Sequence, residues 1–156
     1  MRRAIADVPA GRWPESETVG VVTLPYHDRH RRRVRMTDDG GADFLLDLPQ
    51  AAVLRQGDGL AIEGGGFIRV CAADEAVADL TASSPAHLAK LAWHIGNRHV
   101  PVQVLPNGAL RILDDHVLVD MVRGLGAEVA RRRAPFAPEA GAYAGGHDHD
   151  HDHPHE

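Results

Sequence analysis

One stretch decides the fold of the second half of the chain: Ser84-Pro85-Ala86-His87-Leu88-Ala89-Lys90-Leu91-Ala92-Trp93-His94-Ile95-Gly96-Asn97. Serine is a favoured N-cap residue, and proline fits the first helical position because no hydrogen-bond donor is needed there. Apolar side chains then recur at helical spacing from Leu88 to Ile95. The stretch therefore predicts a helix that ends near Gly96-Asn97.

Strands are predicted on both sides of this helix. One strand precedes it, and two more follow it, joined by the turn Pro106-Asn107-Gly108. A second helix begins after Asp114 or Asp115, either of which can act as its N-cap. The strands are expected at residues 77–81, 100–105, 109–113 and 128–132. The order strand, helix, strand, strand, helix, strand is that of a ferredoxin-like βαββαβ domain, expected over residues 75–134.

The chain before this domain has a different pattern. Short apolar runs are separated by turn sequences such as Asp38-Asp39-Gly40-Gly41, which is typical of small β domains. Residues 18–74 are therefore expected to form an all-β domain. Residues 1–17, rich in Pro, Gly and charge, are expected to be loosely ordered. Residues 135–156 are expected to be a Pro- and Gly-containing linker with a flexible histidine-rich tail. The predicted fold class is α+β.

The last ten residues, His-Asp-His-Asp-His-Asp-His-Pro-His-Glu, carry the strongest chemical signal in the chain. Neutral imidazole is the commonest protein ligand for divalent transition metals. A purification tag is the alternative interpretation, but such tags are usually uninterrupted histidine runs, whereas aspartates alternate with the histidines here. The candidate metal ligands in this tail are His147, His149, His151, His153 and His155.

Composition argues against several classes of protein. The formal net charge is −5, but residues 147–156 contribute four acidic and no basic side chains, so the rest carries only about −1. A near-neutral body argues against general nucleic-acid binding. Cys71 is the only cysteine, which excludes an intrachain disulfide and a paired-thiolate zinc site. Neither a signal peptide nor a membrane-spanning stretch is recognisable, so a cytoplasmic protein without a membrane partner is expected.

Catalytic motifs are absent from the sequence. It contains no phosphate-binding Gly-Lys-Ser/Thr loop, no nucleophile elbow and no His-Glu-x-x-His pattern. The protein is therefore predicted not to be an enzyme.

A dense group of arginines lies in the first domain. It is either a solvated turn and strand or a docking surface, and the sequence leaves both interpretations open. For docking, an acidic partner protein fits better than nucleic acid, because the body is nearly neutral and no aromatic residues are interleaved. The candidate partner-binding residues are Arg29, Arg31, Arg32, Arg33 and Arg35.

His99 lies just after the first helix and before a strand, where side chains reach the surface. One histidine holds a metal poorly by itself, but a two-fold dimer would bring two copies together if His99 lay near the axis. A surface or hydrogen-bonded histidine is the alternative. His87 and His94 share one side of the helix and are expected on a solvated face.

Several segments resemble one known family. The stretch from His87 to Gln103, with its Gly-Asn-Arg-His block ending at His99, resembles the UreE urease accessory proteins, a nickel metallochaperone family. Asp115-His116-Val117-Leu118-Val119-Asp120-Met121 resembles a second signature of the family. Pro135-Phe136-Ala137-Pro138-Glu139-Ala140-Gly141-Ala142-Tyr143 resembles a third. The resemblance covers nearly the whole chain from about Thr18.

This resemblance implies a β domain likened to a peptide-binding module and a ferredoxin-like domain through which two copies form a homodimer. It implies that His99 of both protomers forms the metal site, that His116 is a peripheral ligand, and that the tail adds further ligands. Some members carry another histidine two positions before His116, where this chain has Asp114. Imidazole suits Ni²⁺, Zn²⁺, Cu²⁺ and Co²⁺ alike, so nickel is implied by the resemblance alone.

The predicted function is therefore a nickel metallochaperone that delivers Ni²⁺ for assembly of the urease active site. Its expected partners are the urease accessory GTPase and apo-urease. A general nickel or zinc storage protein is the first alternative, and it would bind metal without any coupling to a GTPase. The second is an RNA- or ribosome-associated module that uses Arg29–Arg35, which would bind RNA in a salt-dependent manner.

Overall fold

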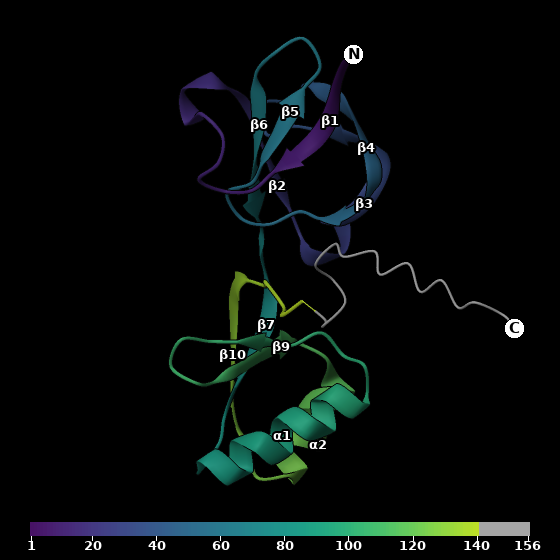
Figure 1. Ribbon diagram of the computed structural model, residues 1–156. Coiled ribbons are helices and arrows are strands. Elements are labelled where there is room, and N and C mark those ends of the chain that lie inside the picture. The colour runs from purple at the N-terminus through teal and green to yellow at the C-terminus, as the bar shows by residue number, and fades with distance from the viewer. Residues whose placement is uncertain (141–156) are drawn as a thin grey trace, which may run out of the picture.

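The structure, a computed structural model, describes residues 1–140 and divides them into two domains (Figure 1). The first domain is built on a six-stranded sheet in the order β2-β6-β5-β1-β4-β3, and the second on a four-stranded sheet in the order β10-β7-β9-β8. Two helices belong to the second domain. The predicted α+β fold class is confirmed. Within residues 1–140, no helix is long and apolar enough to cross a membrane.

Alternating side chains of the first sheet build the core of the β domain. Phe44, Leu46 and Leu48 point to one side of their strand and are almost completely buried, as the two-residue period of a strand requires. All six strands contribute buried side chains to this core. The strands are β1 (Arg2–Val8), β2 (Thr18–Leu24), β3 (His30–Thr37), β4 (Asp43–Val53), β5 (Gly59–Ile62) and β6 (Phe67–Ala72), with short 3-10 helices at Glu15–Glu17 and Tyr26–Asp28.

The expectation that residues 1–17 are loosely ordered is wrong for the first half of that segment. Strand β1 lies inside the sheet, parallel to β4 and antiparallel to β5. The two arginines that argue against a strand both find carboxylates: Arg2 lies 2.8 Å from Asp38, and Arg3 lies 2.7 Å from Asp47. Their charges are therefore balanced by residues about 40 positions away in the sequence, which a local pattern does not reveal.

The second domain has the predicted ferredoxin-like order of elements. Strand β7 pairs antiparallel with both β9 and β10, and β8 pairs antiparallel with β9. Strand β7 begins almost directly after β6, so the two sheets follow one another along the chain with Ala73 between them. The elements are β7 (Asp74–Thr81), α1 (Pro85–Asn97), β8 (Gln103–Val104), β9 (Leu110–Leu113), α2 (His116–Gly124) and β10 (Glu128–Pro135).

Both helices begin at side-chain caps. The hydroxyl of Ser84 accepts a hydrogen bond from the backbone N–H of His87 at 3.0 Å, and Asp115 accepts one from Leu118 at 3.0 Å. Such caps satisfy backbone donors that the first turn leaves free, and each typically stabilises a helix by about 1 kcal/mol. The helices and the sheet share one core, in which the fully buried residues are Ala78, Leu80, Leu91, Ile95, Ile112, Val119 and Val122.

A group of side chains joins the two domains. Arg29, only 1% exposed, donates hydrogen bonds to the carbonyl oxygens of Leu24 and Phe136, and its guanidinium lies 4.0 Å from Glu75. The fully buried ring of Phe136 meets Tyr26 edge-on, with ring centroids 5.3 Å apart. Burial lowers the pKa of the Arg29 guanidinium, and the nearby Glu75 opposes that effect. The segment after β10 is thus held against the β domain.

A pair of carboxyl groups makes the stability of the β domain depend on pH. Burial of Asp7 on β1, together with the neighbouring carboxyl group of Asp58, raises the pKa of Asp7 from 3.8 to about 7. In the unfolded chain the group keeps its ordinary pKa near 4. The folded state therefore binds more protons between these two values, and the free energy of unfolding falls as pH rises through that window.

Replacing Asp7 with asparagine removes this dependence. We expect Asp7→Asn to raise the free energy of unfolding by about 1 kcal/mol at pH 8, a value kept small because solvent screens a partly exposed group. At pH 4, where the Asp7 carboxyl is protonated, the two proteins should be equally stable. Urea denaturation at both pH values measures the difference, with the exposed Glu17→Gln as control. An equal difference at both pH values would contradict the assignment.

Candidate metal centre

His99 stands in an unusual backbone conformation directly after α1. Arg98 is the C-cap of the helix, and His99 follows it with φ 55° and an exposed side chain. It is the one non-glycine residue with positive φ within residues 1–140. Glycine is the usual residue at this position of a helix end, because a side chain in the left-handed region costs roughly 1–2 kcal/mol. The left-handed turn presents the imidazole at the surface.

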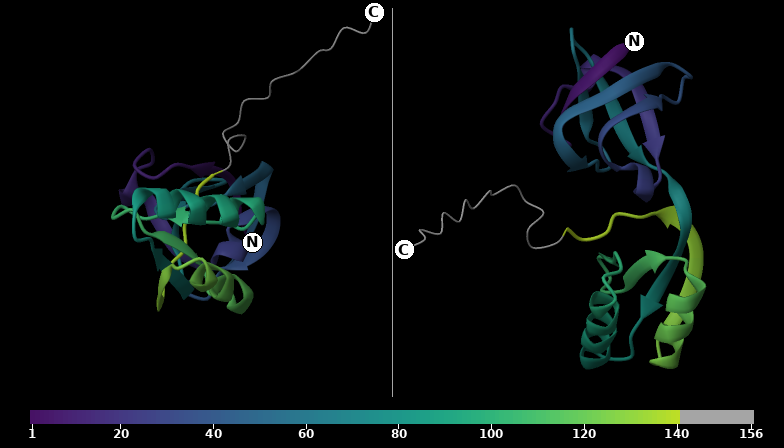
Figure 2. Two further views of the ribbon diagram at one scale, coloured as in Figure 1. Left: turned by 90° about the horizontal axis from the view of Figure 1, so that it is seen from below. Right: turned by 90° about the vertical axis from the view of Figure 1, so that its right-hand side faces the viewer.

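The two helices run antiparallel, so the end of α1 and the start of α2 lie at the same end of the domain. The opposite ends of the two helices are in contact, since Nε2 of His87 near the start of α1 lies 2.7 Å from the carbonyl oxygen of Leu125 just after α2. Figure 2 shows the helices side by side. His99, which follows α1, and His116, which begins α2, are therefore brought to one end of the domain, although no direct contact joins them.

His116 is the first residue of α2 and is exposed. Its Nε2 lies 3.4 Å from a carboxylate oxygen of Asp120, one helical turn later. Asp114, which precedes His116 by two positions, forms an ion pair with Arg131 at 3.2 Å. The acidic neighbour with a direct contact to His116 is thus Asp120, which the sequence analysis missed, although its spacing of four residues is the signal for a contact on a helix surface.

His87 and His94 were predicted to lie on a solvated face of α1, but both are half-buried. Nδ1 of His87 accepts a hydrogen bond from the backbone N–H of Ser83 at 2.9 Å, which assigns the ring proton to Nε2 and makes it the donor to Leu125. Both ring nitrogens are therefore hydrogen bonded: Nδ1 to the loop before α1, and Nε2 to the end of α2. The ring of His94 is half-buried and lies edge-on to Trp93, with centroids 4.9 Å apart.

Large apolar side chains are exposed on both helices. Trp93 on α1 is 64% exposed, and Val117, next to His116 on α2, is 66% exposed. Exposed aromatic and aliphatic side chains are typical of surfaces that bind another protein. Val117 places such a side chain directly beside His116, and Trp93 precedes His99 by six residues.

The five tail histidines, His147, His149, His151, His153 and His155, lie outside the described residues. Within residues 1–140, no group of three His, Cys, Asp or Glu side chains is arranged to hold a metal ion.

The arginine group of the first domain is largely neutralised by carboxylates of the same chain. Arg29 is buried at the domain junction, so its predicted place in an exposed docking surface is wrong. The others lie on the exposed edge strand β3 and are exposed themselves. Arg31 pairs with Asp28 at 3.1 Å, Arg33 with Asp47 at 3.9 Å, and Arg35 with Asp43. A docking role for Arg31, Arg32, Arg33 and Arg35 stays a prediction.

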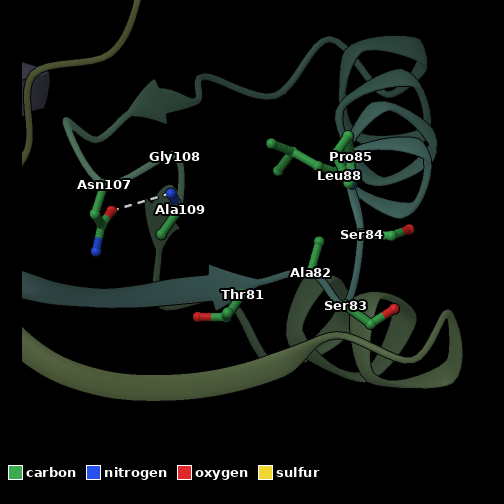
Figure 3. A pocket seen from close by; sticks show the side chains of 9 residues that line it. All are labelled: Thr81, Ala82, Ser83, Ser84, Pro85, Leu88, Asn107, Gly108 and Ala109. Atoms are coloured by element: carbon green, nitrogen blue, oxygen red, sulfur yellow. Dashed lines mark hydrogen bonds between the residues drawn. The ribbon is translucent and has the colours of Figure 1, made fainter.

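A cavity of about 320 Å³ opens at the other end of α1, between the β7–α1 loop and the turn after β8 (Figure 3). Thr81, Ser83 and Ser84 are among the residues that line it, together with Asn107, whose amide oxygen accepts a hydrogen bond from Ala109. The lining offers no imidazole, thiol or carboxylate, and these are the side chains that bind transition metals best. The cavity is therefore no candidate for the metal site.

Comparison with known proteins connects this architecture to one family. Residues 3–73 match the model of the UreE urease accessory protein N-terminal domain, and residues 75–156 match that of its C-terminal domain. The chain is 49% identical to the urease accessory protein UreE of Rhodopseudomonas palustris (strain HaA2), over 87% of this chain and 62% of that protein. It is 46% identical to UreE of Rhodobacter capsulatus, over 99% of this chain and 97% of that protein.

The two matched domains define the chain as one of the urease accessory proteins. More narrowly, the chain belongs to the UreE family, as the sequence analysis predicted. The family consists of accessory proteins of urease and not of enzymes, which agrees with the prediction made from the absence of catalytic motifs. The chain spans about three fifths of the length of some curated relatives, such as that of R. palustris (62%).

Proposed function

We propose that this protein binds Ni²⁺ and delivers it, as a homodimer, for assembly of the urease active site in the cytoplasm. Its family supports a role in urease maturation. The single observation that carries the metal site is His99, an exposed imidazole held in a left-handed conformation at the end of α1. Backbone strain of this kind, kept by a residue that is not glycine, is typical of functional sites.

Two copies of His99 at a two-fold axis would make a metal site that one protomer cannot make alone. In a two-fold interface the same patch of each subunit meets itself, so a residue near the axis appears twice in one site. The exposed Trp93 and Val117 support such an interface at this end of the domain. His116, with Asp120 at 3.4 Å, is a candidate for a separate, weaker site on the same surface.

The tail histidines supply the labile part of this mechanism. Each imidazole donates one electron pair to the metal, and Ni²⁺ then passes between the tail and the His99 pair by stepwise replacement of one ligand by another. Tethering raises the local concentration of the tail ligands at the site. Binding weakens as pH falls through the range in which histidine is protonated, because an imidazolium has no free electron pair for the metal.

Ending the chain at Gly146 tests how the bound Ni²⁺ ions are shared between the tail and the His99 pair. We expect the truncated protein to bind fewer Ni²⁺ ions per dimer than the full chain, since it lacks the five tail histidines, while keeping about one ion at the His99 pair. Nickel titration calorimetry gives the stoichiometry, and sedimentation of the same samples gives the oligomeric state. A truncated chain that still binds the full number of ions would contradict the role of the tail.

Delivery differs from storage in the need for partners. The proposed partners are the urease accessory GTPase and apo-urease, and a storage protein would bind nickel without forming a complex with either. Co-purification of the metal-loaded dimer with the GTPase therefore separates the two functions. Absence of any complex, together with intact metal binding, would favour general nickel or zinc storage.

A further inference from the structure

The segment after β10 folds back across the second domain and is fastened to strand β8. The backbone N–H of Glu139 donates to the carbonyl oxygen of Val102 at 2.8 Å, and the Glu139 carboxylate accepts from the backbone N–H of Val104 at 3.1 Å. The N–H of Ala137 donates to the side-chain oxygen of Gln103 at 3.0 Å. Glu139 thus binds the chain on both sides of Gln103, at Val102 just before β8 and at Val104 within it. Figure 2 shows this segment, in yellow, as it leaves β10.

Strand β8 belongs to the stretch that follows His99. Val102 comes three residues after His99, so the chain between them spans at most about 11 Å. The last described residue, Ala140, follows Glu139 directly, and His147 follows Ala140 by seven residues, which span at most about 25 Å. Ala140, the last described residue before the histidine tail, is therefore held close to the segment that carries His99.

The other end of the same segment is fastened to the β domain. Phe136 is fully buried, contacts Tyr26 edge-on and accepts a hydrogen bond from Arg29 through its carbonyl oxygen. With Phe136 held on one side and Glu139 on the other, the root of the tail is fixed at two points that belong to different domains.

We propose that Glu139 is a positioning residue, which fastens the root of the histidine tail to β8 and so raises the concentration of tail ligands at His99. The proposal rests on the proposed function, because it assigns a use to the closeness of tail and His99. Releasing Glu139 lengthens the free tether from about seven to about ten residues, counted from Ala137. Effective concentration falls roughly as the −3/2 power of tether length, which predicts a loss of roughly twofold.

A nitroxide at position 146 of the metal-free full chain tests the position of the tail directly. In a Cys71→Ser, Gly146→Cys background, the label is expected to broaden the amide signals of residues 98–104 in an NMR spectrum. Glu139→Ala should reduce this broadening at least roughly twofold, whereas Glu139→Gln should retain it, because its side-chain oxygen still accepts from Val104. Glu128→Ala, at an exposed carboxylate of β10, is the matched control. Equal broadening in Glu139→Ala and its parent, or equal loss in Glu139→Gln, would overturn the proposal.

Nickel titration separates this proposal from the function on which it rests. The affinity of each full chain at the His99 site is divided by that of the same variant ending at Gly146. This ratio should fall roughly twofold in Glu139→Ala and stay unchanged in Glu139→Gln. Reduced affinity in the truncated Glu139→Ala chain itself would overturn a positioning role. If the full and truncated parent chains bound nickel equally tightly, while the NMR broadening still depended on Glu139, Glu139 would position the tail. The tail would then not assist metal binding at His99, which would count against the proposed function.

Discussion

Replacing His99 with alanine in a chain that ends at Gly146 is expected to lower nickel affinity by at least about a hundredfold. In the proposed dimer, one substitution removes two imidazoles from the same site, and the truncated chain lacks the tail histidines that could replace them. Loss of an outer hydrogen-bond partner alone typically costs 10- to 100-fold in metal affinity, so loss of the ligands themselves should cost more. Titration calorimetry on the truncated dimer measures the change.

A second substitution at the same position separates metal binding from folding. His99→Gly should lose nickel to the same extent, but it should raise the free energy of unfolding by about 1 kcal/mol, because glycine adopts φ 55° without the strain of a side chain. His99→Ala keeps that strain. If the alanine chain lost nickel while the more stable glycine chain retained it, the imidazole of His99 would not be the ligand.

Replacing Asp79 with alanine is expected to lower the free energy of unfolding by about 3–5 kcal/mol. The Asp79 carboxylate on β7 binds Arg111 on β9 through two hydrogen bonds of 2.7 and 3.0 Å, and Arg132 on β10 adds a third at 3.3 Å. Asp79 and Arg111 are 9% and 8% exposed. Removing the carboxylate leaves the Arg111 guanidinium buried without its counter-charge, which is the costly way to break such a pair.

The double substitution Asp79→Leu, Arg111→Met provides the control. It removes both charges but keeps similar side-chain volume. It should therefore recover most of the free energy of unfolding that Asp79→Ala loses, since apolar side chains often replace a buried ion pair at little cost. Urea denaturation of the single and double variants gives the free energies. A loss below about 1 kcal/mol for Asp79→Ala would mean that water reaches Arg111 and screens its charge.

The second domain could be predicted from the sequence because its signals are local. Ser84 and Asp115 act as N-caps as expected, and helical spacing located both α1 and α2. Residues with distant partners could not be predicted in the same way. Strand β1 was hidden because Arg2 and Arg3 are neutralised by Asp38 and Asp47, whose positions depend on the fold.

The candidate site was predicted in part. The position of His99 between a helix and a strand predicted a surface residue, and the family resemblance implied His116 as a peripheral ligand. Neither revealed the left-handed backbone of His99, because histidine carries no such signal at a helix end. Arg29 was assigned to an exposed surface, since its partner Phe136 is 107 residues away. His87 was assigned to solvent, since its partner Leu125 belongs to the far end of α2. Contacts between distant parts of the chain determine where Arg29 and His87 lie.

The contact between Glu139 and β8 also bears on aggregation. Strand β8 is an outer strand of the four-stranded sheet, and an outer strand with free backbone groups is a template on which further strands can add. Here the carbonyl of Val102 and the N–H of Val104 are already occupied by Glu139. While Glu139 is bound, the outer edge of β8 has no free backbone groups at these two positions. The β8 strands of two molecules therefore cannot pair to form a continuous sheet.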